Sequence, residues 1–251
     1  MTYCLAIKVD AGIVFCSDSR TNAGIDQVST YGKMYKFGLP GLRQLVLLSA
    51  GNLATTQGVI AKIKKDIKDD APQSLMNVSS IDEAADYIGE ISVAQQAKFT
   101  GGTTNYEASF ILGGQIKNSK HAISMIYAQG NHINSSKQTP YLQIGESKYG
   151  KPILDRILTM DTTLETASLC ALVSMDSTMR SNLTVGPPIE LQIYEQDTME
   201  MKRYYNLGED SEYYRELHRA WDLRLVEAFR QLPPLNWSLT WDSQPDEQNE
   251  S

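Results

Sequence analysis

The 251-residue sequence has few cysteines, few histidines and no long apolar run. Its three cysteines, Cys4, Cys16 and Cys170, form no CxxC pair and stand in apolar stretches. This pattern favours buried free thiols in a reducing compartment over a disulfide framework. The chain shows neither the basic and apolar regions of a signal peptide nor the run of about 18 apolar residues that indicates a membrane span. We therefore expect a cytoplasmic protein without a membrane partner.

Positive charge is also scarce and scattered. The chain has 23 Lys and Arg against 30 Asp and Glu, a formal net charge of -7. The one basic cluster, between Lys62 and Lys68, is interleaved with aspartates and is typical of a solvated helix face. An acidic chain without a basic stripe argues against a nucleic-acid partner.

Several catalytic signatures are missing. The sequence contains no HExxH, no Walker A loop and no GxSxG. Its three histidines, His121, His132 and His218, stand in dissimilar contexts, which favours neither a metal site nor a Ser-His-Asp triad. We expect no metal and no cofactor.

What the sequence does have begins at its first residues. Thr2 to Val9 alternates two sets of side chains, both largely apolar, as in a sheet covered on each side. A turn at Asp10-Ala11-Gly12 leads into a second strand, Ile13 to Ser17. The further predicted elements are strands within 28–37, at 45–50, 108–112, 122–127, near 142, at 189–194 and 201–205, and helices at 53–68, 81–99, within 145–158, at 163–175 and after 208.

Two of these helices carry capping signatures. Ser80 with Glu83, and Thr162 with Glu165, match the capping box, and the second helix is expected to end near Met175. The order strands, helices, strands, helices, strands fits two antiparallel sheets with a helical layer on each outer face. We predict an α+β, four-layer αββα domain over residues 2–207, followed by a helical extension and polar tail over 208–251.

Thr2 can act as a nucleophile in a way that an internal threonine cannot. It directly follows Met1 and is small enough for that methionine to be trimmed, so we expect a mature chain that starts with a free Thr amine. The hydroxyl of such a residue can attack while its own α-amine, with a usual pKa of about 7.7–8.0, takes the proton. The alternative is that Thr2 merely opens an edge strand.

Three further features accompany Thr2: Asp18 at the end of the second strand, Lys33, and an apolar strand that ends in Ser49-Ala50-Gly51. Together they resemble the proteasome family of N-terminal-nucleophile hydrolases, over roughly residues 2–206. Asp18-Ser19-Arg20-Thr21 is similar to the Asp-x-Arg motif of that family. The Ser174-Met175-Asp176-Ser177-Thr178 run and the long C-terminal extension resemble its bacterial branch, the ancestral β-subunit type called Anbu.

The resemblance implies a role for each matching residue. Thr2 would be the nucleophile, and Lys33, as an ammonium beside it, would lower the hydroxyl pKa and keep the amine neutral. Asp18 would hold Lys33 in place. The backbone N–H of Gly51 would donate to the oxyanion, and glycine permits the close approach.

The acidic partner of the terminal amine is less clearly defined. Asp176 matches it by resemblance, with Ser177 and Ser181 competing as its serine partner; Asp176 could also be a helix-end charge. The segment Ile144-Gly145-Glu146-Ser147 resembles the Ile-Gly-Ser-Gly turn of the family. Either Glu146 replaces the usual serine or Ser147 takes over by a shift.

The resemblance implies a threonine peptidase acting on peptides or unfolded proteins within a self-assembled ring, closed or open, with an ATPase partner undecided. The extension after Gly208 is a candidate contact for neighbouring subunits. Two alternatives remain open: an amidase or acylase that uses Thr2 on a small amide, and a catalytically silent structural subunit.

Overall fold

The computed structural model describes residues 1–22, 28–99 and 105–234. It contains two five-stranded antiparallel sheets, one in the order β10-β1-β2-β11-β12 and the other in the order β5-β6-β7-β8-β9, and a separate pair, β3-β4. The strands are β1 Tyr3–Val9, β2 Gly12–Ser17, β3 Arg20–Asn22, β4 Val28–Thr30, β5 Met34–Leu39, β6 Arg43–Gly51, β7 Ala108–Ile116, β8 Ala122–Ile126, β9 His132–Asn134, β10 Tyr141–Gly145, β11 Ile189–Glu195 and β12 Arg203–Leu207. The helices are α1 Leu53–Lys68, α2 Ile81–Gln96, a 3-10 turn η1 Ala97–Phe99, α3 Lys151–Ile157, α4 Leu164–Ser181 and α5 Glu212–Arg230.

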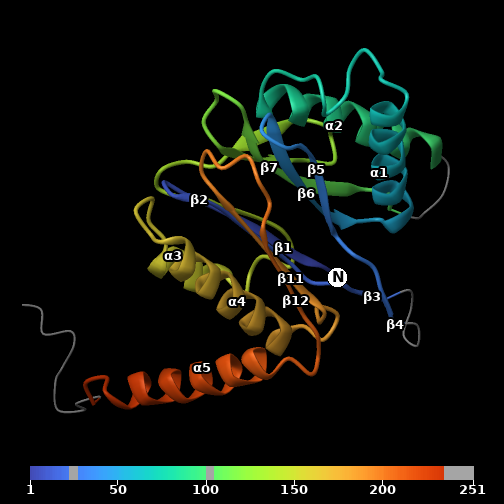
Figure 1. Ribbon diagram of the computed structural model, residues 1–251. Coiled ribbons are helices and arrows are strands. Elements are labelled where there is room, and N and C mark those ends of the chain that lie inside the picture. The colour runs from blue at the N-terminus through green and yellow to red at the C-terminus, as the bar shows by residue number, and fades with distance from the viewer. Residues whose placement is uncertain (23–27, 100–104, 235–251) are drawn as a thin grey trace, which may run out of the picture.

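The two sheets face each other between helical layers (Figure 1). Helices α1 and α2 cover the outer face of the β5–β9 sheet, and α3 and α4 cover the outer face of the other. The predicted α+β, four-layer αββα architecture is confirmed. Strand β1 shows how the sequence produces it: Tyr3, Leu5 and Ile7 pack against the helices, whereas Cys4 and Ala6 pack between the sheets.

Side-chain caps set the helix starts. The Asn52 side chain accepts from the N–H groups of Ala54 and Thr55 and so begins α1 at the predicted residue. Ser80 caps α2 as predicted, with its hydroxyl 3.0 Å from the N–H of Glu83. The Glu83 carboxylate accepts from Ser79 rather than closing a capping box on Ser80.

Helix α4 differs from its prediction at both ends. Its N-cap is Thr163 instead of Thr162, because the Thr162 hydroxyl accepts the N–H of Thr159 in the preceding turn. The helix runs six residues past Met175, to Ser181. The polar residues around this point are held by protein within the helix: the Ser174 hydroxyl lies 2.7 Å from the Tyr3 hydroxyl.

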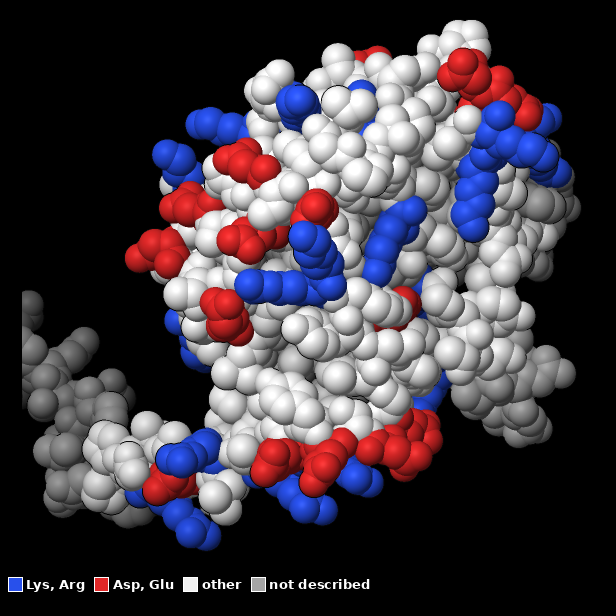
Figure 2. All heavy atoms as spheres, viewed as in Figure 1, with Lys and Arg blue, Asp and Glu red and all other residues white. Residues whose placement is uncertain are grey.

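Helix α5 crosses the outer face of α4 and projects beyond it (Figure 1). It begins at the N-cap Ser211, and none of its residues is buried. The domain boundary at 207/208 stays a prediction, and the expected polar tail from Asp242 lies outside the described residues. On the face seen in Figure 2, Lys and Arg side chains are interspersed with Asp and Glu.

The three cysteines are buried free thiols, as the sequence predicts. Within residues 1–22, 28–99 and 105–234, no helix combines the length and apolarity that crossing a membrane requires.

Candidate active site

Thr2 lines a cavity of about 310 Å³. The cavity is lined by the chain start and by residues of β5, β6, α1 and the end of β10, among them Lys33, Gly51 and Leu53. Tyr31 and Tyr35 add two aromatic rings to its wall. Thr2 is therefore half-buried beside two of the residues that the sequence assigned to the same site.

Lys33 and Asp18 form a buried ion pair next to this cavity. The Lys33 ammonium donates to Asp18 Oδ1 at 2.7 Å, and the Asp18 side chain has no exposed surface. The ammonium also donates to the carbonyl of Arg20 at 2.6 Å. Burial raises the pKa of Asp18, while Lys33 and two backbone N–H groups oppose that rise. A buried charge needs such partners, so this pair fixes the ammonium at the cavity wall.

Asp18 is in turn fastened to the backbone around it. Its Oδ1 accepts the N–H of Tyr3 at 3.0 Å, and its Oδ2 accepts the N–H of Gly186 at 3.3 Å. Arg20, two residues on, donates to the carbonyl of Leu183 and so holds the same loop rather than the cavity.

Gly51 ends β6 in a conformation that glycine alone adopts easily. Its φ is 109°, and a Cβ there would collide with the carbonyl oxygen of Glu107. This turn connects β6 to α1 and places Gly51 on the cavity wall.

The terminal amine, which belongs to Met1 in this chain, lies within the field of three charged side chains. Burial lowers the pKa of this amine, and the ammonium of Lys33 lowers it further. The carboxylates of Asp18 and Glu146 act in the opposite direction.

Glu146 is joined to Thr2 through the backbone. Its N–H donates to the carbonyl of Thr2 at 2.7 Å, just beyond the β1–β10 ladder in which Tyr3 pairs with Gly145. Glu146 is 8 % exposed, and its carboxylate accepts from Asn182 Nδ2 at 3.2 Å. Glu146 therefore contacts the chain start through its backbone N–H.

Comparison with solved structures places this geometry in a family. Anbu (ancestral β-subunit) from Yersinia bercovieri is 46% identical with a TM-score of 0.90, and the match covers 94% of this chain and 99% of that one. The chain belongs to the Anbu family of proteasome homologues.

Two other Anbu structures support the assignment. The Anbu complex from Pseudomonas aeruginosa, described as a helical assembly, is 46% identical with a TM-score of 0.90 and covers 94% of this chain and 98% of that one. Anbu from Hyphomicrobium sp. strain MC1 is 41% identical with a TM-score of 0.86, and the match covers 93% of this chain and 99% of that one. No protein-family model and no curated protein matches the chain.

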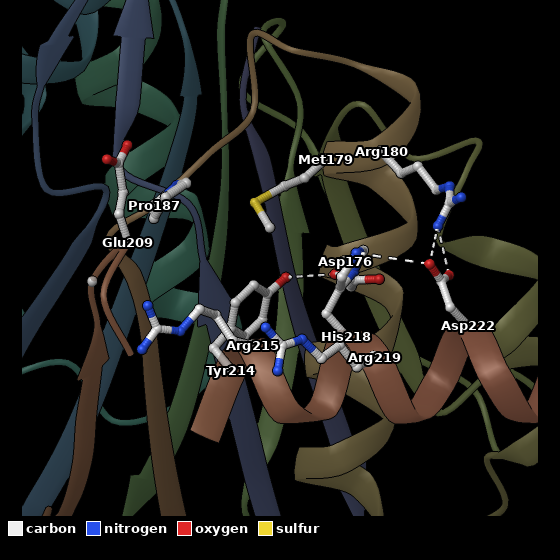
Figure 3. A pocket seen from close by; sticks show the side chains of 11 residues that line it. Asp176, Met179, Arg180, Pro187, Glu209, Tyr214, Arg215, His218, Arg219 and Asp222 are labelled. Carbon is white, nitrogen blue, oxygen red and sulfur yellow. Dashed lines mark hydrogen bonds and ion pairs between the residues drawn. The ribbon is translucent and has the colours of Figure 1, made fainter. Parts of the chain in front are cut away.

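Not every predicted site residue of this Anbu chain lies at the cavity. Asp176 is buried within α4 and points at α5, where its Oδ1 accepts from His218 Nδ1 at 2.8 Å and from the Tyr214 hydroxyl at 3.2 Å (Figure 3). Ser177 follows it inside the same helix, and Ser181 is exposed at the helix end. The contacts found for Asp176 thus link two helices.

Asn182 is the site residue that sequence reasoning missed. It is the C-cap of α4, and its Oδ1 accepts from both the N–H and the hydroxyl of Thr184 at 3.0 and 2.6 Å. Its amide group is thereby oriented toward Glu146. The missed signal was the length of α4, because a helix ending at Ser181 rather than Met175 brings Asn182 within reach of Glu146.

Proposed function

We propose that this Anbu protein is a threonine-type peptidase whose nucleophile is Thr2, exposed as the N-terminal residue by removal of Met1. The observation that carries the proposal is the placement of Thr2, Lys33 and Gly51 around one cavity, with Lys33 fixed by Asp18. An ammonium buried beside a chain start has a clear catalytic use, because it stabilises a developing alkoxide.

In this mechanism Thr2 Oγ forms a bond to the carbonyl carbon of the scissile amide, and its proton passes to the Thr2 α-amine. The negative charge that develops on the carbonyl oxygen is stabilised by the N–H of Gly51, a contribution of about 2.7–4 kcal/mol for such a donor. The C–N bond then breaks, and the α-amine returns the proton to the leaving amine. Water hydrolyses the acyl ester on Thr2 and restores the hydroxyl.

The proposed substrates are peptides or unfolded proteins in the cytoplasm, cut within a self-assembled ring that is closed or open. The helical assembly of the Pseudomonas aeruginosa relative supports self-association. The exposed aromatic and aliphatic residues of α5 offer a surface for such contacts; among them are Tyr213, Leu223 and Phe229, which are 54%, 69% and 74% exposed.

The test is the intact mass of the purified protein before and after exposure to a peptidyl epoxyketone. This electrophile requires a hydroxyl and a free α-amine on the same residue to close its ring adduct. We expect a mass without Met1 that gains one adduct, and no adduct in Thr2→Ala.

Other outcomes separate the alternatives. Removal of Met1 without an adduct would favour an amidase or acylase with a site closed to this peptide. Retention of Met1 without an adduct would favour a silent structural subunit. Native mass spectrometry of the same sample measures whether the chain assembles.

A further inference from the structure

We propose that Glu146 is the positioning residue of the Thr2 nucleophile: its N–H fixes the Thr2 carbonyl, and its buried carboxylate, held by Asn182, accepts the α-amine of the mature chain. This inference rests on the proposed function for its catalytic meaning. It assigns the role to a carboxylate at a turn where the resembling family carries a serine, and gives Asn182 the task of orienting it.

The first step is the backbone contact. Gly145 has a φ of 82°, and a Cβ there would collide with the carbonyl oxygen of Thr2. This close approach lets the N–H of Glu146 reach that oxygen at 2.7 Å. The nucleophile's own carbonyl is therefore held by the residue that carries the carboxylate.

The second step is the position of the carboxylate. Glu146 as a residue is 8 % exposed, and the hydrogen bond found for its carboxylate comes from the neutral amide of Asn182 at 3.2 Å. One amide donor does not balance a buried negative charge, which favours an additional cationic partner. Lys33 is engaged with Asp18 and with the Arg20 carbonyl. The Met1 amine interacts electrostatically with Glu146, and we assign the terminal amine as the cationic partner.

The third step is the charge balance of the site. In the unprocessed chain, the charges of Lys33, Asp18 and Glu146 act on the amine of Met1, one residue before the Thr2 amine of the mature chain. Two cations, the ammonium of Lys33 and the terminal amine, face two carboxylates. Glu146 raises the pKa of the amine and Lys33 lowers it. The opposing charges of Glu146 and Lys33 therefore set the pH at which the amine becomes a free base. The Glu146 carboxylate fixes the orientation of that amine.

The deciding measurement is the titration of the terminal amine, followed by NMR after ¹³C reductive methylation, in the wild-type protein and in Glu146→Gln. Removing the carboxylate destabilises the ammonium, so the pKa of the amine is expected to fall in Glu146→Gln. The matched control is Glu90→Gln, the same change at an exposed position of α2, where the titration is expected to stay at the wild-type value. Equal titration of wild type and Glu146→Gln would overturn the proposal.

The second measurement is the rate of epoxyketone adduct formation against pH. In Glu146→Gln the rise of the adduct rate on the acidic side of the pH profile is expected to move to lower pH. The plateau rate is expected to fall by about tenfold to a hundredfold, because the base is misplaced. If Glu146 had only a structural role, its replacement would lower the adduct rate without shifting the acidic side of the pH profile. Glu146→Asp, which keeps the charge, is expected to restore the acidic side of the profile toward wild type.

The amine titration needs no substrate, so it remains decisive if the wild-type protein forms no adduct. The absence of an adduct would overturn the proposed peptidase function. The titration alone would then decide whether Glu146 contacts the amine. If Glu146→Gln does not fold, Asn182→Ala takes its place. Freeing the carboxylate from its anchor is expected to lower the amine pKa, and an unchanged titration would count against the proposal.

Discussion

Lys33 and Asp18 meet at 2.7 Å with the carboxylate fully buried, and the same carboxylate oxygen accepts the N–H of Tyr3. The ammonium is thus tied, through one oxygen atom, to the residue that follows Thr2. Any displacement of the pair moves the start of β1, and this coupling explains why an ion pair is maintained at the end of two buried strands.

Replacing Lys33 by Met tests the pair. We expect loss of epoxyketone adduct by about a hundredfold or more, since a charged group at the reacting oxygen is removed. The terminal amine should titrate at higher pH than in wild type, because Lys33 lowers its pKa. This shift is opposite in sign to that expected for Glu146→Gln. Stability should fall by about 3–5 kcal/mol in urea unfolding, since Asp18 loses its partner.

Lys36→Met is the matched control for that variant. Lys36 lies three residues after Lys33, within β5, and its ammonium stacks on the Tyr204 ring at 3.3 Å; it does not line the cavity. Its replacement should leave the amine titration and the adduct rate at wild-type values. If Lys33→Met keeps a wild-type adduct rate, Lys33 has no part in the chemistry.

Gly51→Ala tests the turn between β6 and α1. A side chain at a φ of 109° costs about 1–3 kcal/mol in strain, and the collision with the Glu107 carbonyl adds to it. We expect a lower midpoint in thermal unfolding and loss of adduct formation. Gly208→Ala is the control, because an added Cβ there meets no atom within 4 Å. Equal thermal midpoints for the two variants would contradict the strain argument.

The cysteines should be unreactive in the folded protein. All three are buried, and burial raises the pKa of the Cys170 thiol to about 12, so it forms almost no thiolate at neutral pH. Intact mass after iodoacetamide treatment is expected to show no alkylation in the native state and three additions in denaturant. Rapid native alkylation would show that one of these thiols is accessible. The result also excludes cysteine as the source of an epoxyketone adduct.

Tyr214→Phe tests how α5 is held on α4. The change removes the hydroxyl that donates to the buried Asp176 but leaves His218 in place, so we expect about 1 kcal/mol of lost stability and faster hydrogen exchange along α5. Tyr213→Phe removes a hydroxyl from a side chain that is 54% exposed and should stay within about 0.5 kcal/mol of wild type. Identical exchange in the two variants would mean that the Tyr214 hydroxyl bond to Asp176 does not hold α5.

Most of the fold was predictable because it depends on local patterns. The alternation in β1 reports that both faces of its sheet are covered, and side-chain caps at Asn52 and Ser80 mark where helices begin. The end of α4 was not predictable in the same way. Ser174 and Asp176 look like helix-end residues until their partners, Tyr3 and α5, are known.

The sequence by itself determined the αββα layers and the set of Thr2, Asp18, Lys33 and Gly51, because strand periodicity and a recognisable motif are carried by neighbouring residues. Only the tertiary structure decided what surrounds each carboxylate. By resemblance the sequence assigned this role to Asp176, but the Asp176 carboxylate contacts α5, whereas the N–H of Glu146 reaches the Thr2 carbonyl and its carboxylate accepts from Asn182. A buried carboxylate is defined by the donors around it, and those donors come from segments far apart in the chain.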